Sequence, residues 1–157
     1  MSTDQSAEVF WTPPRWLIPS ITSLQVAIYE FSRGRLMNNA AGMPHVVIRG
    51  VRRRSGKPFA ICLPYWLDDE GRRLIVASFS GAPKNPAWYH NMKDARANPT
   101  VRVRDGARVF RARVEVVESE EREELWPRLV ADRPFYARYQ EQTERRIPLL
   151  RLIEESA

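Results

Sequence analysis

The sequence contains few of the residues that bind metals or form disulfides. Its 157 residues include one cysteine, Cys62, and two histidines, His45 and His90. One cysteine cannot close an intramolecular disulfide, and this ligand set is thin for structural zinc. We therefore predict no metal site. We expect Cys62, which lies in an apolar run, to be a small buried residue rather than a nucleophile.

Long hydrophobic runs are also absent. The longest uncharged stretch, residues 16–29, is interrupted by polar residues and is too short to cross a bilayer core of about 30 Å. The first residues include Asp4 and Glu8 and lack the basic start of a secretory signal. We expect a cytoplasmic protein, with peripheral contact at the inner face of the membrane as an open alternative.

The composition is that of one globular domain. Hydrophobic residues make up 43% and charged residues 28%, which is enough apolar material for one core. We predict a flexible, proline-containing arm over residues 1–19 and a single domain over residues 20–157. The net charge of +6 favours an anionic partner, such as a phosphorylated cofactor, an acidic membrane or a nucleic acid.

The first part of the chain predicts one helix and then three strands. Ile21, Leu24, Ile28 and Phe31 recur at helical spacing, so we expect an amphipathic helix over residues 20–36 with Ser20 as its N-cap. Such a helix either covers a core or pocket, which we favour, or lies on a membrane. Three apolar runs bounded by turn residues then predict strands over residues 45–49, 58–66 and 74–79.

The second part predicts a hairpin between helices and a final strand. Asp105-Gly106 separates two alternating runs, residues 101–104 and 110–116, which is a strong hairpin signal. One helix is expected over residues 83–98. A second is expected to begin at a Ser119 cap, with a bend or a later start at Pro127, and a third is expected over residues 134–145. The last strand is expected over residues 147–153.

Six strands with short links predict an α+β fold whose main element is an antiparallel sheet. Closing such a sheet into a barrel protects its edges, so we predict a six-stranded β-barrel with flanking helices. Strands and helices do not alternate along the chain as a doubly wound parallel sheet requires.

A basic turn over residues 50–58 is the first candidate site. Arg52, Arg53, Arg54 and Lys57 lie in it with two glycines and no acidic residue, a pattern that suits a multiply anionic group. The turn is not a Walker loop, because its glycine spacing differs and Pro58 stands where a magnesium-binding hydroxyl would be. The alternative is a solvated β-turn.

Two further segments are candidates. Residues 80–91 run from a glycine turn into a proline-opened helix, where Lys84 adds charge and Trp88 can lie beside a planar ring or fill the core. Tyr136 and Tyr139 share one helix face and can donate hydrogen bonds or a proton, although ordinary packing explains them too. His90 is expected to be a surface or capping residue.

The run Gly81-Ala82-Pro83-Lys84-Asn85-Pro86-Ala87-Trp88-Tyr89-His90-Asn91, together with the basic turn, resembles the deazaflavin-dependent nitroreductase family. These are coenzyme F-420-linked enzymes of actinobacteria with a split β-barrel fold. The resemblance implies that the phosphate and glutamate tail of the coenzyme is held by Arg53, Arg54, Ser55 and Lys57. It also implies that the deazaflavin is bound by the strand Phe59, Ala60, Ile61, Cys62 and Leu63, by Ala77 and Ser78, and by Lys84, Pro86, Ala87, Trp88 and Asn91.

The resemblance also implies the activity. We predict a reductase that passes hydride from the reduced coenzyme to a quinone, a nitroaromatic or a similar acceptor, with FMN a less favoured cofactor. Tyr136 would orient or protonate the acceptor and Tyr139 would support it. Two departures concern the tail and the acceptor pocket, since Phe59 stands where the family often has arginine and Arg133 where it often has tyrosine.

The predicted partners are an electron acceptor and a separate enzyme that reduces the coenzyme, in a monomer or homodimer. One alternative function is a protein that binds the coenzyme or a lipid without turnover. A less favoured alternative is a nucleic-acid-binding barrel that uses the strand arginines Arg102, Arg104, Arg111 and Arg113.

Overall fold

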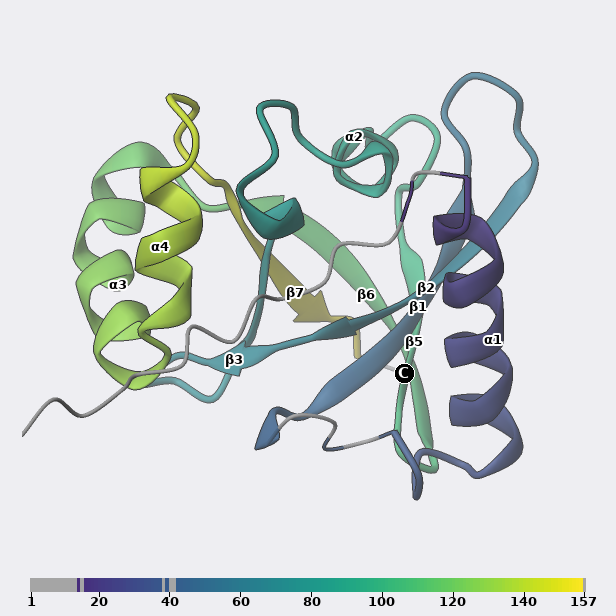
Figure 1. Cartoon of the computed structure of the whole chain (residues 1–157). Helices are drawn as coiled ribbons and strands as arrows, with labels where there is room; N and C mark the ends of the chain where they lie inside the picture. The colour runs from purple at the N-terminus through teal and green to yellow at the C-terminus, as the bar shows by residue number, and fades with distance from the viewer. Residues whose placement is uncertain (1–13, 15, 38, 40–41, 157) are drawn as a thin grey trace, which may run out of the picture.

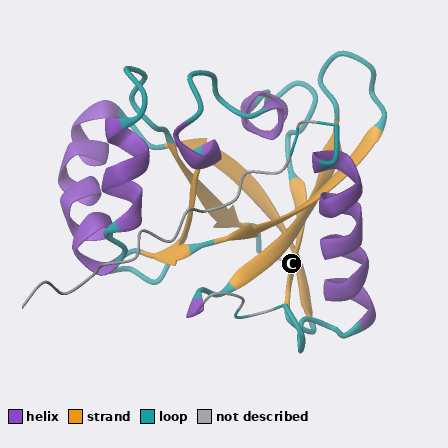
Figure 2. Cartoon of the chain, in the orientation of Figure 1, coloured by secondary structure: helices purple, strands orange, loops and turns teal. Residues whose placement is uncertain are grey.

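The computed structural model describes residues 14, 16–37, 39 and 42–156. Figures 1 and 2 show a curled sheet with α3 and α4 at one end and α1 at the other. The elements are α1 (Ile18–Phe31), β1 (His45–Val51), β2 (Pro58–Pro64), β3 (Trp66–Leu67), β4 (Arg73–Val76), the 3-10 helix η2 (Phe79–Gly81), α2 (Ala87–Lys93), β5 (Val101–Asp105), β6 (Arg108–Val116), α3 (Ser119–Asp132), α4 (Phe135–Glu141) and β7 (Leu149–Glu154).

The strands form one antiparallel sheet in the order β2-β1-β5-β6-β7-β4-β3. The sheet curls into a half-barrel, so the α+β, mainly antiparallel architecture is confirmed. The predicted count of six strands is wrong, because the apolar run of residues 58–66 breaks. β2 ends at Pro64, the Tyr65 N–H donates to the Pro44 carbonyl at 2.9 Å, and Trp66 starts a separate strand paired with β4.

Two large apolar clusters hold the half-barrel together, and a third, smaller one lies under α1. One lies inside the curl, where Ile48, Ile75, Val103 and Leu150 are fully buried beneath α2. The other lies at the far end, where α3 and α4 cover β4 and β7. No helix within the described part of the chain is long and apolar enough to cross a membrane.

Helix α1 is confirmed as a cover, but its predicted apolar face is not the face that packs. Val26 and Tyr29 are buried against β1 and β2, whereas Leu24 is 61% and Phe31 92% exposed. The Tyr29 hydroxyl donates to the His45 carbonyl at 3.0 Å and accepts from the Gly106 N–H at 2.7 Å. A tyrosine that bonds to β1 and to the turn between β5 and β6 therefore orients the helix more strongly than its apolar stripe does.

Several helix ends differ from the predictions. Helix α1 starts at Ile18, so Ser20 lies inside it and is not its N-cap; most of the predicted arm, residues 1–13 and 15, lies outside the described residues. Helix α2 covers only Ala87–Lys93, since Pro86 is extended and precedes it. Helix α3 begins at Ser119 with Glu118 as N-cap, and it continues through Pro127.

Candidate functional site

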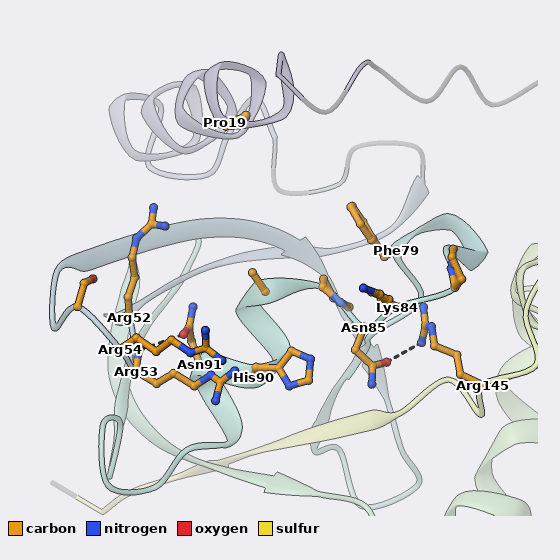
Figure 3. Close-up of a pocket in the computed structure, with 14 residues that line it drawn as sticks. Pro19, Arg52, Arg53, Arg54, Phe79, Lys84, Asn85, His90, Asn91 and Arg145 are labelled. Atoms are coloured by element: carbon orange, nitrogen blue, oxygen red, sulfur yellow. Dashed lines mark hydrogen bonds between the residues drawn. The ribbon is translucent and has the colours of Figure 1, made fainter.

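A groove of about 860 Å³ opens between the basic turn, the segment of residues 79–91 and the start of α1. In Figure 3, Arg53, Arg54 and His90 extend into the same space, Pro19 of α1 lies across from them, and Lys84, Asn85 and Phe79 lie toward the other end. Among the described residues, the lining of this basic groove includes five cationic side chains and no carboxylate: Arg52, Arg53, Arg54, Lys84 and Arg145.

The basic turn is closed by its own backbone. The Arg52 N–H donates to the Lys57 carbonyl at 2.8 Å, and the Gly56 N–H donates to the Arg52 carbonyl at 2.8 Å. Gly56 has a positive φ of 70°, a conformation that favours glycine. The Asn91 side-chain oxygen accepts from the Arg53 N–H at 3.0 Å, which joins the turn to α2.

Asn98 joins the basic turn to α2 through side-chain hydrogen bonds. It is 4% exposed, its Oδ1 accepts from the Val51 N–H at 2.8 Å, and its Nδ2 donates to the Val51 and Asn91 carbonyls at 2.8 Å. A Cβ at Gly50 would stand 2.6 Å from the Asn98 Oδ1, so only glycine fits there. One buried amide therefore sets the distance between the basic turn and α2.

Arg145 holds the other side of the basic groove. Its guanidinium donates to the carbonyls of Ala77, Ser78 and Ala82 at 3.1, 2.6 and 2.8 Å, and to the Asn85 Oδ1 at 2.7 Å. The last bond is drawn in Figure 3. Burial lowers the pKa of Arg145 from its ordinary value. Arg145 thus fixes the segment that leads into α2.

The strained part of this segment is η2. Phe79 and Ser80 have positive φ angles of 45° and 52°. Gly81 follows with a φ of 76°, and a Cβ there would stand 2.6 Å from the Tyr139 carbonyl of α4. The groove wall is therefore packed directly against the C-terminal half of α4.

A second groove of about 570 Å³ adjoins the first and shares Pro19, Arg52, Ala87 and Asn91 with it. This adjoining groove runs beneath α1 along the start of β2 and is lined by Phe59, Ala60, Ile61 and Trp88. Glu30, Arg49 and Arg52 line it as well, so its wall combines apolar and charged side chains. Charged and apolar binding surfaces are thus continuous.

The two grooves bring together eleven of the sixteen predicted cofactor-binding residues. The basic groove contains Arg53, Arg54, Ser55, Lys84, Pro86, Ala87 and Asn91. The adjoining groove adds Phe59, Ala60, Ile61 and Trp88. The linings do not include Lys57, Cys62, Leu63, Ala77 or Ser78.

The five remaining residues lie outside both linings. Lys57 is exposed on the basic turn, and Ala77 is fully buried in the barrel core. Cys62 is 8% exposed beneath α1, and burial raises its thiol pKa to about 11, so the thiol stays protonated at neutral pH. The prediction that Cys62 is a buried apolar residue is confirmed.

The two predicted catalytic tyrosines lie on α4, outside the lining of both grooves. Tyr136 is 3% exposed among the apolar residues under α3 and α4, and Tyr139 is half-buried. Burial raises the pKa of Tyr136 to about 12, although the nearby Arg133 guanidinium opposes the rise. The two rings meet edge to face at 6.1 Å. Tyr136 is therefore a neutral phenol held by packing.

His90 lies in the basic groove rather than at a remote surface position. Its pKa is lowered by desolvation and by the charges of Lys93, Arg53 and Arg54. At neutral pH it is an uncharged imidazole among cations. Among the described residues, no group of three acidic, histidine or cysteine side chains is arranged to hold a metal ion.

The sequence-based prediction missed Arg145 and Asn98. Both act across long stretches of chain: Asn98 bonds 47 residues back to Val51, and Arg145 bonds 60 residues back to Asn85. Neither position carries a motif signal of its own.

Comparisons with known proteins agree with this geometry. Residues 22–154 match the family model described as F420H(2)-dependent quinone reductase. The chain belongs to this family. A putative F420H(2)-dependent quinone reductase of Mycobacterium tuberculosis, Rv3178, is 34% identical over 108 residues, which cover 69% of this chain and 87% of that protein. The F420H(2)-dependent quinone reductase Rv1261c of the same organism is 32% identical over 131 residues, covering 81% and 85%.

Two solved structures have the same architecture. One, titled as an F420-H2 dependent reductase (FDR-A), is 38% identical with a TM-score of 0.57 and covers 69% of this chain and 93% of that one. Another, titled as a domain-swapped dimer, is 32% identical with a TM-score of 0.60 and covers 90% and 99%. The split-barrel prediction and the resemblance to deazaflavin-linked reductases are both confirmed.

Proposed function

We propose that this protein is a reductase that uses reduced coenzyme F420 to reduce a quinone. The observation that carries the proposal is that the basic groove, whose described lining holds no carboxylate, is continuous with a groove that contains Phe59, Ile61 and Trp88. A ligand with an anionic tail and a planar ring system fits this pair of surfaces. The names of the relatives indicate which ligand this is, coenzyme F420. The shape and charge of the two grooves support the same ligand independently.

The basic turn would hold the anionic tail. Arg53 and Arg54 lie in the lining with Lys84 opposite, and no carboxylate competes with a bound phosphate or carboxylate. Guanidinium groups bind such oxyanions through two parallel hydrogen bonds, which makes them stronger partners than neutral donors. Lys57 is exposed on the same turn and can reach a long tail.

The adjoining groove would hold the ring system. Phe59, Ile61 and Trp88 provide apolar surface on which a planar ring can rest while α1 covers it from above. When bound and reduced, the coenzyme supplies the hydride. The protein's part is to orient the ring and to keep water from it, and Asn98 and Arg145 do so indirectly by fixing the walls.

The acceptor takes two electrons and a proton as hydride, and a second proton completes the hydroquinone. A neutral tyrosine can donate a hydrogen bond to the acceptor oxygen or supply that proton. Of the two phenols on α4, Tyr139 is half-buried and Tyr136 is 3% exposed. We propose that Tyr139 addresses the acceptor and that Tyr136 supports its ring, which exchanges the roles expected from the sequence.

Arg133 affects which electron acceptors the protein prefers. It lies beside Tyr136 at the end of α3, with 11% of its side chain exposed. A guanidinium at this position favours acceptors that carry negative charge or accept hydrogen bonds. Arg133→Tyr should improve kcat/KM for a neutral nitroaromatic relative to an anionic quinone, and an unchanged ratio would remove Arg133 from this role.

The function is tested by mixing purified protein with reduced coenzyme F420 and menadione and following the recovery of the oxidised coenzyme's absorbance. The proposal predicts recovery that depends on both protein and quinone. Coenzyme binding without reoxidation by any quinone or nitroaromatic would instead identify a carrier. Tight copurification of FMN would indicate a flavin enzyme.

We further propose a homodimer, supported by the relative whose title names a domain-swapped dimer. Leu24 and Phe31 on α1 offer an exposed apolar surface that a second copy can cover. Light scattering during size-exclusion chromatography should give twice the mass of the chain. Peripheral membrane contact through α1 stays a prediction, and flotation with anionic liposomes tests it.

A further inference from the structure

The outward face of β5 and β6 carries a second concentration of positive charge. Along both strands, arginines alternate with core residues, so their side chains share the face turned away from the barrel interior. This outer arginine face consists of Arg102, Arg104, Arg111 and Arg113. Arg104 is half-buried and the other three are exposed. All four lie outside the linings of the two grooves.

The arrangement opposes the stability of the sheet. Arg102 pairs directly with Arg111 on β6 and with Arg49 on β1. Like charges directly opposite each other on neighbouring strands are destabilising. An arrangement of arginines that destabilises the sheet is not expected on a face whose only role is structural.

Carboxylates within the protein leave most of this charge unbalanced. Glu30 binds Arg49 through two hydrogen bonds of 2.9 and 2.5 Å, and it also lines a small cleft with Arg102 and Arg104, so it offsets part of the charge of these two arginines. Arg111 donates twice to the Thr100 hydroxyl, at 3.1 and 2.7 Å, which positions it without neutralising it. Within the described part of the chain, Arg102, Arg104 and Arg113 form no ion pair.

The surface is open to a partner. Figure 1 places α1 at one end of the sheet and α3 with α4 at the other, with β5 and β6 between them. A shallow groove of about 410 Å³ crosses this region and is lined in part by Thr100, Arg102, Val109 and Arg111. Val109 is 39% exposed.

We propose that the outer arginine face binds an acidic segment of a partner protein in extended conformation. Arg102 and Arg104 are two residues apart on one strand, as are Arg111 and Arg113, so each pair repeats at roughly 6.8 Å. An extended peptide with glutamate or aspartate at alternate positions has the same repeat. Each carboxylate can then meet one guanidinium fork.

The chemistry of the face favours carboxylates over nucleic acid. Single-stranded nucleic acid is held by aromatic residues that stack on its bases as well as by cations. The aromatic residue of β6, Phe110, is half-buried at the edge of the shallow groove, where it packs against the barrel core and beneath the guanidinium groups of Arg73 and Arg108. The neighbours on the outer side are instead the exposed Val109 and the half-buried Thr100.

The test uses a fluorescein-labelled peptide of twelve residues that alternates glutamate and serine, titrated with the full chain at low salt and followed by anisotropy. Replacing Arg102 and Arg104 together with Gln should weaken binding about 10-fold, because two exposed ion pairs are lost. The matched control, Arg128→Gln with Arg138→Gln, removes the same charge from α3 and α4 and should change binding no more than about twofold. Menadione-dependent turnover should be unchanged in both double variants.

Three results would overturn the proposal. The first is equal affinity in the Arg102/Arg104 variant and the control. The second is loss of peptide binding only when Arg53 and Arg54 are replaced by Gln, which would place the peptide in the basic groove. The third is tighter, Arg102-dependent binding of an oligothymidylate with six phosphates, which would make the face a nucleic-acid surface.

Discussion

Arginine serves opposite purposes in two regions of this protein. Arg151, which is 2% exposed, forms ion pairs with Asp68, Glu115 and Glu121. The basic groove brings Arg52, Arg53 and Arg54 to its lining without any carboxylate. The comparison shows that a guanidinium neutralised within the protein holds the fold together, whereas the guanidinium groups of the basic turn, which have no carboxylate partner among the described residues, are available to a ligand.

The two environments also differ in their effect on ionisation. Burial lowers the pKa of Arg151, but hydrogen bonds and attraction from Glu121 and Glu115 outweigh it, so the net shift is upward. In the groove the unpaired cations act on a neighbour instead, since Arg53 and Arg54 contribute to the lowered pKa of His90 after desolvation and Lys93.

The largest expected effect comes from removing the buried cation. Arg151→Met leaves Asp68, whose side chain is 3% exposed, with less compensation, and should lower the free energy of unfolding by about 3 kcal/mol. Arg54→Met, the matched change in the groove, should alter it by less than about 0.5 kcal/mol. Urea unfolding of both variants measures this; equal losses would show that the two regions do not differ.

The next effect concerns the phenols. Tyr139→Phe should lower kcat for menadione about 10-fold while coenzyme affinity holds, because only a hydroxyl near the acceptor is lost. Tyr136→Phe removes a buried hydroxyl and should change kcat by less than about twofold. Steady-state kinetics of both variants decide the matter, and a larger kcat loss in Tyr136→Phe would restore the role expected from the sequence.

The salt dependence of ligand affinity should distinguish the basic groove from an ordinary flavin site. Screening weakens interactions between exposed charges, so raising salt from 50 to 300 mM should weaken F420 binding several-fold. FMN, whose tail carries less charge, should respond less. Fluorescence titrations of both ligands provide the comparison, and equal salt responses would argue against tail binding by the basic turn.

The smallest effect is a shift in one histidine. An anionic ligand in the basic groove offsets Arg53 and Arg54, so the pKa of His90 should rise when the ligand binds. Affinity should then increase as the pH falls through that range, because the complex takes up a proton. Imidazole resonances of His90 in NMR titrations report the shift.

His45 is an internal control for that experiment. Its pKa is lowered mainly by burial, and its Nδ1 lies 2.8 Å from the Met43 carbonyl, away from the groove lining. It should titrate unchanged when the ligand binds. A shift of both histidines would indicate a global change rather than binding beside His90.

The sequence predicts the strands of this fold better than the orientation of its helices. Alternation and the Asp105-Gly106 turn locate β5 and β6 because both signals are local. Which face of α1 packs against the sheet depends on contacts with residues far away in the sequence. Apolar spacing selects Leu24 and Phe31, but the hydrogen bonds of Tyr29 to His45 and Gly106, up to 77 residues away, turn that face outward.

The residues of the candidate site also fall into those that the sequence predicts and those that it does not. Residues that touch a ligand lie in short motifs with recognisable chemistry, so Arg53, Lys84 and Trp88 can be proposed from the sequence. Residues that position those motifs lack such patterns. Asn98 and Arg145 act through backbone carbonyls, and any carbonyl in the chain presents the same acceptor, so only the folded structure identifies their partners.

The most direct test of the central claim compares the native protein with Arg54→Ala/Lys57→Ala in menadione-dependent reoxidation of reduced coenzyme F420. Two lost charge-assisted contacts, each worth roughly 1.5–3 kcal/mol, should raise the KM for the coenzyme at least 10²-fold. The kcat at saturation and the free energy of unfolding should change little, because the turn is exposed. An unchanged KM, or no reoxidation by the native protein, would contradict the account.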